Sequence, residues 1–277
     1  MSHHLARSHY SPEGLEARTL AALGRAGISA DGAPVDVEAL APLDQFHAGG
    51  LAATIDLIEM LDPAPDTRVL DIGSGLGGPA RVLASRRGCR VTGVDLMPDY
   101  VAIADRLSEL CGLTDATTFI QGDALALGLS GPAFHHAWAL HVAMNIRDSR
   151  SFYRGAHDAI MSGGRFLSYD VVESEFPRVD FPVPWASSAE LSHLRTREQT
   201  TEALAEAGFV NIRAIDRTHE ASAALARATS GSPSLPPSLS LGVLLGPRTV
   251  EMVANFAHAL RTGGVRIIVF IATKPAQ

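Results

Sequence analysis

The chain has 277 residues, of which 46% are hydrophobic and 19% charged, and its formal net charge is −7 at pH 7. This length can bury a sizeable core within one domain. The negative charge argues against nucleic acid or an anionic membrane surface as the main partner.

The sequence also bears on where the protein is expected to work. No apolar run approaches the roughly 18 residues of a membrane span, and the N-terminus lacks the apolar core of a signal peptide. Only two cysteines are present, which favours a reducing, cytoplasmic location. Arginine supplies all but one of the 23 basic residues, a bias that indicates a GC-rich bacterial genome.

The N-terminal part of the chain is predicted to be helical, with a break. Ser11 and Pro12 are typical of a helix cap and a first-turn proline, and the pattern after them predicts an amphipathic helix to about Arg25. Gly32–Pro42 is typical of a linker, and a second helix is expected at about Gly50–Leu61.

Strands and helices alternate over the rest of the chain. Short apolar, β-branched runs predict strands at Arg68–Ile72, Arg90–Asp95, Thr117–Gln121, Phe134–Leu140, Arg165–Val172, Val210–Asp216 and Val265–Ala272. Helices are expected at about Pro79–Arg87, Pro98–Cys111, Arg150–Met161, Arg197–Ala207, Glu220–Ala228 and Leu241–Leu260. The last helix is expected to turn five apolar side chains inward: Leu244, Val250, Val253, Phe256 and Leu260.

A glycine-rich elbow follows the first predicted strand. Gly73, Gly75, Gly77 and Gly78 turn the chain between that strand and a helix that opens near Ala80. Glycine has no Cβ, so the backbone can take unusual angles and a ligand can approach closely. The N–H groups of a helix N-terminus favour an anion or a carboxylate. A strand, an elbow and a helix in this order predict a nucleotide-type cofactor site.

Three acidic residues narrow the choice of cofactor. Asp95 ends the second strand about 20 residues after Gly75, where a carboxylate can accept hydrogen bonds from both hydroxyls of a ribose, as in NAD-binding proteins. Asp71 lies two residues before the first glycine, where the NAD fingerprint usually has an apolar residue. The third strand ends in Gly122-Asp123-Ala124, and an acid there can bind an adenine amino group.

With these residues the chain resembles the class I methyltransferases that use S-adenosylmethionine. Their first motif, D-x-G-x-G-x-G, is matched from Asp71 to Gly77, their second-strand acid by Asp95, and their third-strand Gly-Asp-Ala by residues 122–124. Agreement in three places outweighs the alternative that the glycines only make a tight turn. The resemblance implies S-adenosyl-L-methionine as cofactor and S-adenosyl-L-homocysteine as product. The residues expected to bind them are Gln45, Asp71, Gly73, Ser74, Gly75, Asp95, Leu96, Met97, Asp123, Ala124 and Leu140.

The expected fold is α/β, a Rossmann-like, seven-stranded, mostly parallel sheet with helices on both faces. We expect a single methyltransferase domain over residues 1–277. Its parts would be an N-terminal helical arm or lid (1–62), a cofactor-binding core (63–217), a helical insertion (218–263) and a final strand (264–277). Ligands of such sheets bind outside the carboxyl ends of the strands. The arm, the Pro-rich loop at Glu173–Ser187 and the insertion could then close over the cofactor.

The segment after the fourth strand is expected to face the reactive end of the cofactor. Methyl transfer needs in-line alignment and exclusion of water, and an amine or hydroxyl acceptor must also lose a proton. His141 is the candidate base or substrate-orienting residue, with Asn145 as a polar partner. The alternative is that His141 only caps the strand or contacts the cofactor. His135 and His136 lie inside the fourth strand, and no metal site is expected there because no third ligand lies nearby in the sequence.

Over almost its whole length the chain also resembles the bacterial sarcosine/dimethylglycine-type small-molecule methyltransferases. The segments that carry this resemblance are His9-Tyr10, Leu43–His47, Leu70–Arg81, His141–Asp148, Pro182–Ala186 and Leu245–Asn255. In related enzymes a tyrosine near the N-terminus and the residues before the first helix close over the cofactor. The resemblance therefore implies a catalytic role for Tyr10 and site roles for Gln45 and His47. The alternative for all three is simple packing of the arm.

The chain departs from that group in several places. Ala139-Leu140 stands where the group tends to carry Thr-Gln, His258-Ala259 where it carries Arg-Asn, and Phe270 where it carries Gln. A pocket that holds a small zwitterion must pair its polar groups with it. Their loss predicts a bulkier or more apolar, natural-product-type acceptor.

Several functions stay open at this point. The resemblance favours an amine nitrogen as the methylated atom, while O- or C-methylation is an alternative. A cyclase or isomerase of secondary metabolism could bind the same cofactor without methyl transfer. A regulatory protein that is not an enzyme is disfavoured by the set of Asp71, Asp95 and Asp123. We expect a small-molecule substrate as the partner, no nucleic acid and no membrane, and a homodimer is compatible with the sequence.

Overall fold

The structure is a computed structural model that describes residues 14–29, 33–128, 131–176, 178–230 and 239–276. Its centre is a seven-stranded sheet in the order β3-β2-β1-β4-β5-β7-β6. The strands are β1 (Arg68–Ile72), β2 (Arg90–Asp95), β3 (Thr117–Gln121), β4 (Phe134–Leu140), β5 (Ile160–Glu173), β6 (Val210–Asp216) and β7 (Val265–Thr273). Neighbours from β3 to β5 pair in parallel, whereas β7 runs antiparallel to both β5 and β6. The predicted fold class is confirmed.

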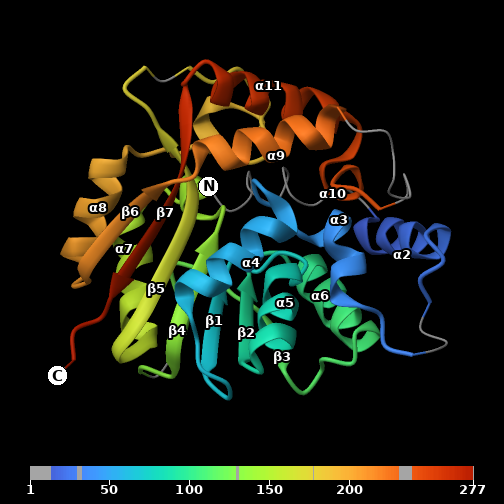
Figure 1. Cartoon of the computed structure of the whole chain (residues 1–277), viewed down its shortest axis with the longest axis horizontal. Coiled ribbons are helices and arrows are strands. Elements are labelled where there is room, and N and C mark those ends of the chain that lie inside the picture. Colours follow the sequence, from blue (N-terminus) through green and yellow to red (C-terminus); the bar gives the residue numbers. More distant parts are fainter. Residues whose placement is uncertain (1–13, 30–32, 129–130, 177, 231–238, 277) are drawn as a thin grey trace.

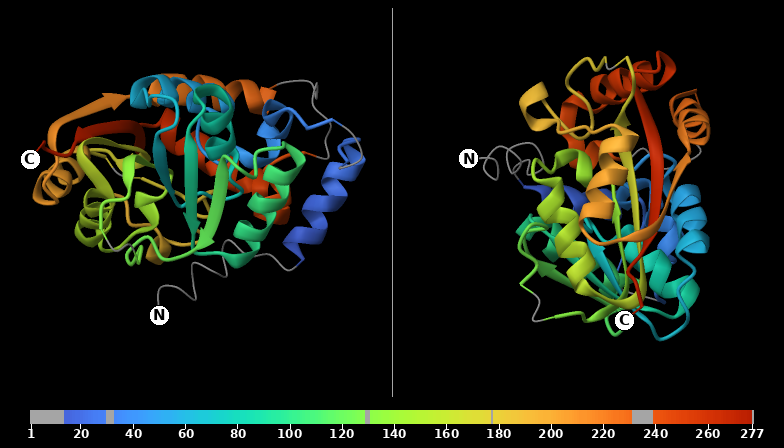
Figure 2. Two further views of the ribbon diagram at one scale, coloured as in Figure 1. Left: turned by 90° about the horizontal axis from the view of Figure 1, so that it is seen from below. Right: turned by 90° about the vertical axis from the view of Figure 1, so that its left-hand side faces the viewer.

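Helices cover both faces of this sheet. They are α2 (Leu15–Arg25), α3 (Ala41–Asp44), α4 (Gly50–Leu61), α5 (Gly78–Arg87), α6 (Pro98–Leu110), α7 (Ser149–Ala159), α8 (Arg197–Glu206), α9 (Thr218–Ser230), α10 (Gly242–Leu245) and α11 (Thr249–Arg261). Short 3-10 turns are η1 (Val37–Leu40), η2 (Ala143–Asn145), η3 (Ala189–Leu191) and η4 (Gly246–Arg248). Helices α4 and α5 lie on one side of the sheet and α7 and α8 on the other (Figure 2). None of the helices in the described ranges is long and apolar enough to cross a membrane.

The apolar core is divided by the sheet into two clusters. Successive side chains of a strand point to opposite faces, and in β1 Val69 belongs to one cluster while Leu70 and Ile72 belong to the other. The first cluster includes Leu107 of α6, and the second includes Phe152 of α7. Both faces of β1 are therefore buried, which explains why its sequence is a continuous apolar run apart from Asp71.

The fifth strand differs from its predicted bounds. It begins at Ile160 instead of Arg165, and α7 ends at Ala159 instead of Met161. Gly163 and Gly164, which precede the predicted start of the strand and favour a turn, lie inside the strand, where Gly163 has a φ of +79°. The register between β4 and β5 shifts at this place. Glycine here permits an irregularity within a strand and does not end it.

The late insertion also differs from the prediction. The single helix expected over Leu241–Leu260 is divided into α10, η4 and α11 at Gly246, whose φ is +72°. Leu244, Phe256 and Leu260 are buried as expected, but Val250 is 82% exposed. Because the helix is broken at Gly246, the residues after the break face other directions than they would in one continuous helix. The apolar repeat of the sequence therefore does not form one continuous buried face.

The segment before α4 is more ordered than the predicted linker. Residues 37–44 form η1 and α3, and the side chain of Leu40, the last residue of η1, is fully buried. Ser11 and Pro12, the predicted start of the first helix, lie outside the described residues, and α2 begins at Leu15.

Candidate active site

A cavity of about 1050 Å³ lies at the carboxyl ends of β1, β2 and β4. The insertion helices α9 and α11 lie above the ends of these strands (Figure 1) and contribute to the wall. The sheet order reverses at this position, because β1 has β2 on one side and β4 on the other. Open α/β sheets bind their ligands at such a switch point.

The glycine elbow forms the floor of this cavity. Gly73, Gly75 and Gly77 have φ angles of +74°, +56° and +75°, which side chains rarely tolerate. A Cβ on Gly73 would also collide with Val142, and one on Gly77 with Phe119. The first and third glycines are thus needed for packing as well as for the turn. A Cβ on Gly75 would meet open space, so this position needs glycine only for its backbone angle.

Asp95 supports the elbow and lines the cavity. Its Oδ2 accepts a hydrogen bond from the Gly75 N–H at 2.8 Å, and its Oδ1 accepts one from the Met97 N–H at 2.9 Å. A carboxylate oxygen has two acceptor positions, so each oxygen keeps one for a ligand hydroxyl. The pair fits the two hydroxyls of a ribose.

Two buried side-chain oxygen atoms, both in the elbow or next to it, lack hydrogen-bond partners among the described residues. They are the Asp71 Oδ2 atom and the Ser74 Oγ atom. Burial and then the charge of Asp95 raise the pKa of Asp71 to about 8, and the Trp138 indole opposes this rise only in part. A buried carboxyl with one oxygen atom left without a partner fits the cationic amino group of a bound amino acid moiety. Together with the Asp95 diol site, these residues fit S-adenosylmethionine.

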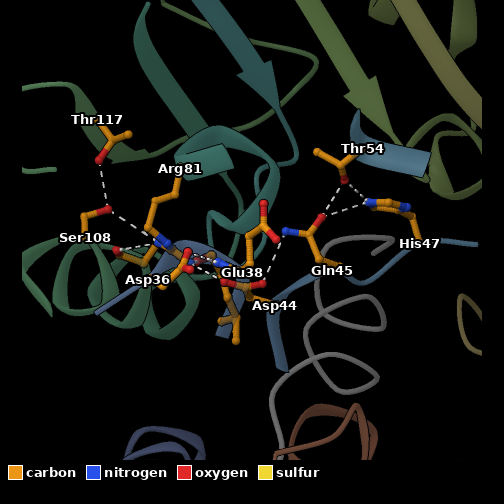
Figure 3. A network of polar contacts seen from close by, with 11 residues as sticks. Asp36, Glu38, Asp44, Gln45, His47, Thr54, Arg81, Ser108 and Thr117 are labelled. Atoms are coloured by element: carbon orange, nitrogen blue, oxygen red, sulfur yellow. Dashed lines mark hydrogen bonds and ion pairs between the residues drawn. The ribbon is translucent and has the colours of Figure 1, made fainter. Parts of the chain in front are cut away.

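A buried polar network connects the elbow to the segment Asp44–His47, which we call the strap (Figure 3). The Arg81 guanidinium donates to Asp44 Oδ2 at 2.8 Å and to the Leu76 carbonyl of the elbow at 2.6 Å. Neither side chain of this ion pair is exposed by more than 1%. Arg81 also donates to the Ala104 carbonyl at 3.0 Å. The sequence did not indicate this pair, because no local pattern links its two members.

The other end of the strap reaches the reactive part of the cavity. The Gln45 side-chain carbonyl accepts a hydrogen bond from the Thr54 hydroxyl at 2.5 Å, and His47 Nε2 lies 2.9 Å from the same hydroxyl (Figure 3). Burial lowers the pKa of His47 to about 4, so its imidazole is neutral. Gln45 and His47 both line the cavity.

His141 follows β4 in a left-handed conformation with a φ of +57°. Its ring lies 5.3 Å from the ring of Tyr169 and 6.1 Å from that of His47. Its Nε2 accepts a long hydrogen bond of 3.4 Å from the Ala48 N–H. Burial, and then the neighbouring His47, keep the pKa of His141 well below the usual range. A neutral imidazole therefore lines the cavity. Because its Nε2 accepts from Ala48, its Nδ1 carries the proton and is the nitrogen that can donate to a ligand.

Asp170 on β5 holds this strained turn in place. Its Oδ1 accepts hydrogen bonds from the Val142 and Ala143 N–H groups at 2.8 and 2.9 Å, and its Oδ2 accepts one from the Ser168 hydroxyl. Burial raises the pKa of Asp170 to about 6. Asp170 was not among the predicted site residues, although its place near the end of a buried strand could have indicated it.

The outer half of the cavity is largely apolar. Its walls come from η2, the Pro-rich loop, α9 and the segment 239–256, and include Met144, Trp185, Leu225, Leu241, Val253 and Phe256. Asn145 stands at the edge of this half and donates to the Trp185 carbonyl at 2.6 Å. Among the positions where the chain departs from its apparent relatives, only Leu140 lines the cavity. Ala139 and Phe270 are fully buried in the core, so the prediction that they shape the pocket was wrong.

The cavity brings together nearly all of the predicted site residues. Its lining includes His141, His47 and Asn145, and the cofactor set Gln45, Asp71, Gly73, Ser74, Gly75, Asp95, Leu96, Met97, Asp123, Ala124 and Leu140. Tyr10 lies outside the described residues. Helix α2 contacts α10 through an Arg18 hydrogen bond to the Gly242 carbonyl and does not line the cavity. Among the described residues, no three His, Cys, Asp or Glu side chains are grouped so that they could hold a metal ion.

Comparison with known proteins identifies the domain. Residues 70–168 match the methyltransferase domain family. An O-methyltransferase of Pyrenophora dematioidea is 24% identical over 63% of this chain and 66% of its own length. The erythromycin 3''-O-methyltransferase of Saccharopolyspora erythraea is 31% identical over 52% of this chain and 51% of its own length. The chain spans about half to two thirds of the length of these relatives.

Solved structures share the fold over nearly the whole chain. The geranyl diphosphate C-methyltransferase of Streptomyces coelicolor has a TM-score of 0.70 and 20% identity, covering 99% of this chain and 97% of that one. The [4+2]-cyclase SpnF has a TM-score of 0.61 and 20% identity, covering 97% and 98%. A Galdieria sulphuraria protein assigned as a sarcosine dimethylglycine methyltransferase has a TM-score of 0.61 and 16% identity, covering 81% and 84%. Residues 70–168 therefore form a methyltransferase domain, in agreement with the motifs and the fold of the chain.

Proposed function

We propose that the protein transfers a methyl group from S-adenosylmethionine to an amine nitrogen of a bulky, largely apolar small molecule. The observation that carries this proposal is the division of one cavity into two halves. The inner half holds the elbow, Asp71 and Asp95, and the outer half is walled by apolar side chains such as Trp185 and Phe256. His141 and Asn145 stand where the halves meet.

The inner half would hold the cofactor by its ribose and its amino acid part. Asp95 would accept hydrogen bonds from the ribose hydroxyls, and Asp71 would pair with the amino group. Asp123 and Ala124, after β3, would face the adenine ring. When bound, the cofactor supplies an electrophilic methyl group on a sulfonium. The apolar outer half excludes water from that methyl group, which favours a poorly solvated nucleophile.

The charge of the outer half supports a neutral amine as the nucleophile. The described residues that line it include no carboxylate, so an ammonium ion would lose its hydration without gaining a counter-charge. Such an environment favours the unprotonated amine, which is the form that carries a reactive lone pair.

The low pKa of His141 makes it a poor final proton acceptor. We therefore assign His141 the role of orienting the acceptor by a hydrogen bond, and Asn145 the role of shaping the edge of its site. The proton would then leave to water after the transfer.

A second candidate function is a cyclase that binds the same cofactor without methyl transfer. The fold likeness to the [4+2]-cyclase SpnF, and the apolar outer half of the cavity, favour it as the alternative. Product analysis separates the two. Apolar amines and matched alcohols would be incubated with methyl-deuterated S-adenosylmethionine and examined by mass spectrometry.

Deuterated methyl on an amine supports the proposal, and deuterated methyl only on the alcohols would contradict the assignment to nitrogen. Failure to label any acceptor, by a protein that still binds S-adenosylhomocysteine, favours the cyclase. His141→Ala should reduce the labelling. The matched control is His258→Ala, because His258 is an exposed histidine of α11 that does not line the cavity.

A further inference from the structure

A second cavity of about 590 Å³ adjoins the first. It lies between the segment after η2, the segment 192–195 and helix α8, and its walls are mostly polar. Two residues, Arg147 and His193, line both cavities. These residues therefore mark the junction between the apolar outer half of the active site and a polar space beyond it.

The charges along the main cavity are segregated. Its four carboxylates, Asp44, Asp71, Asp95 and Asp123, all lie at the cofactor half. The titratable groups of the described residues that line the outer half are Arg147, His193 and Arg227. In a chain with a net charge of −7, this concentration of cationic groups without carboxylates is unexpected. The Arg147 guanidinium forms no hydrogen bond or ion pair with any described residue.

Hydrogen bonds from the Arg195 side chain hold the backbone at Arg147 and His193 in place. Arg195 Nη1 donates to the carbonyls of Ile146 and His193, both at 3.0 Å, and its Nη2 donates to the Arg147 carbonyl at 2.5 Å. The His193 N–H donates to the Met144 carbonyl at 2.7 Å, which ties segment 192–195 to η2. This bracing holds the backbone at both residues, so that the exposed Arg147 side chain and the half-buried His193 side chain start from fixed positions.

The local field at the junction is positive as a result of this arrangement. Burial, and then the charges of Arg147 and Arg195, lower the pKa of His193. Two of the three acidic groups nearby have other partners. Glu206 pairs with Arg150 at 2.7 Å, Asp148 caps α7 by accepting from Ser151, and Glu202 lines the second cavity.

We infer that the junction at Arg147 and His193 binds an acidic group of the acceptor, a carboxylate or a phosphoryl group. A guanidinium presents a planar fork that matches such groups in a bidentate manner. This inference rests on the proposed function. The acceptor would place its amine near His141, its apolar body along the outer half, and its acidic group at the junction.

Two fluorescent probes of nearly the same shape test the anion site. They are 8-anilinonaphthalene-1-sulfonate, which is anionic, and N-phenyl-1-naphthylamine, which lacks the sulfonate. Each is titrated into protein saturated with S-adenosylhomocysteine, so that the inner half is filled. Arg147→Gln should raise the dissociation constant of the anionic probe roughly 10- to 100-fold, the loss expected for a charge-assisted hydrogen bond. The affinity for the neutral probe should not change.

Two further variants separate charge from packing. Arg147→Lys should keep part of the affinity for the anionic probe, because the charge stays while the fork is lost. Arg150→Gln should leave both probes unaffected, because Arg150 lines only the second cavity and is paired with Glu206. An equal loss of both probes in Arg147→Gln, or no loss of either, would overturn the proposal.

Competition against the anionic probe identifies the acidic group. Tighter displacement by 1-naphthoate points to a carboxylate, and tighter displacement by 1-naphthyl phosphate points to a phosphoryl group. Displacement by neither would overturn the proposal. None of these measurements requires methyl transfer. A protein that shows the predicted selectivity but methylates no acceptor would contradict the proposed function and leave the anion site standing.

Discussion

Asp95→Ala should weaken cofactor binding through the loss of the ribose contacts. In the structure each Asp95 oxygen accepts one backbone N–H, from Gly75 at 2.8 Å and from Met97 at 2.9 Å, and keeps one acceptor position for a ribose hydroxyl. Hydrogen bonds to a charged group contribute about 1.5–3 kcal/mol. The dissociation constant of S-adenosylhomocysteine should therefore rise roughly 10- to 150-fold.

Isothermal titration calorimetry measures this effect. An analogue without the ribose hydroxyls separates the loss of the ribose contacts from the loss of the support that Asp95 gives to the elbow. The analogue should lose little affinity in Asp95→Ala, because its partner groups are already absent. Asp115→Ala, at an exposed position on the loop before β3, is the matched control. An unchanged dissociation constant would reject the ribose assignment. An equal loss for the analogue would show that Asp95 acts only by supporting the elbow.

Four other changes test the rest of the site. Arg81→Met should destabilise the fold by about 3–5 kcal/mol in urea unfolding, because it leaves Asp44 buried and unpaired, and adding Asp44→Leu should recover much of this loss. The pKa of Asp71 is about 8 in the fold against an ordinary value of 3.8, so the fold favours its protonated form and the stability it contributes falls as pH rises through that interval. Wild type should accordingly lose stability relative to Asp71→Asn as pH rises from 3.8 to about 8 in thermal unfolding, and parallel curves would contradict the assignment. Asp170→Ala leaves the Val142 and Ala143 N–H groups without their acceptor, so turnover should fall while the affinity for S-adenosylhomocysteine changes little. His141→Ala should likewise reduce kcat more than cofactor affinity, and the opposite pattern would make His141 a cofactor contact.

The central sheet could be predicted well because its signals are local. Strands β1 to β4 have the expected bounds. They are short runs rich in β-branched, aromatic or other apolar residues, and the first three are closed by a glycine or an acid. The motif acids Asp71 and Asp95 lie at the carboxyl ends of two predicted strands. Because parallel strands place these ends at the same edge of the sheet, the sequence predicted that the two acids lie close together. Where a local signal had two meanings, as at Gly163 inside β5, the prediction was wrong.

The remaining features depend on contacts between distant segments. Arg81 and Asp44 are charged residues that a sequence pattern places on the surface, yet their side chains are buried against each other. Asp170 is separated by a long stretch of chain from the Val142 N–H whose hydrogen bond it accepts. The apolar outer half also does not come from Phe270, the position expected to shape the pocket, because that side chain is in the core. Phe256, which was predicted only to face inward, is in the cavity wall.

A crystal structure of the protein with S-adenosylhomocysteine would test the assignment of the two halves of the cavity most directly. We expect the ribose on Asp95, the amino group beside Asp71, and the sulfur directed past His141 into the apolar outer half. A cofactor bound elsewhere, or a sulfur turned away from the outer half, would contradict this assignment.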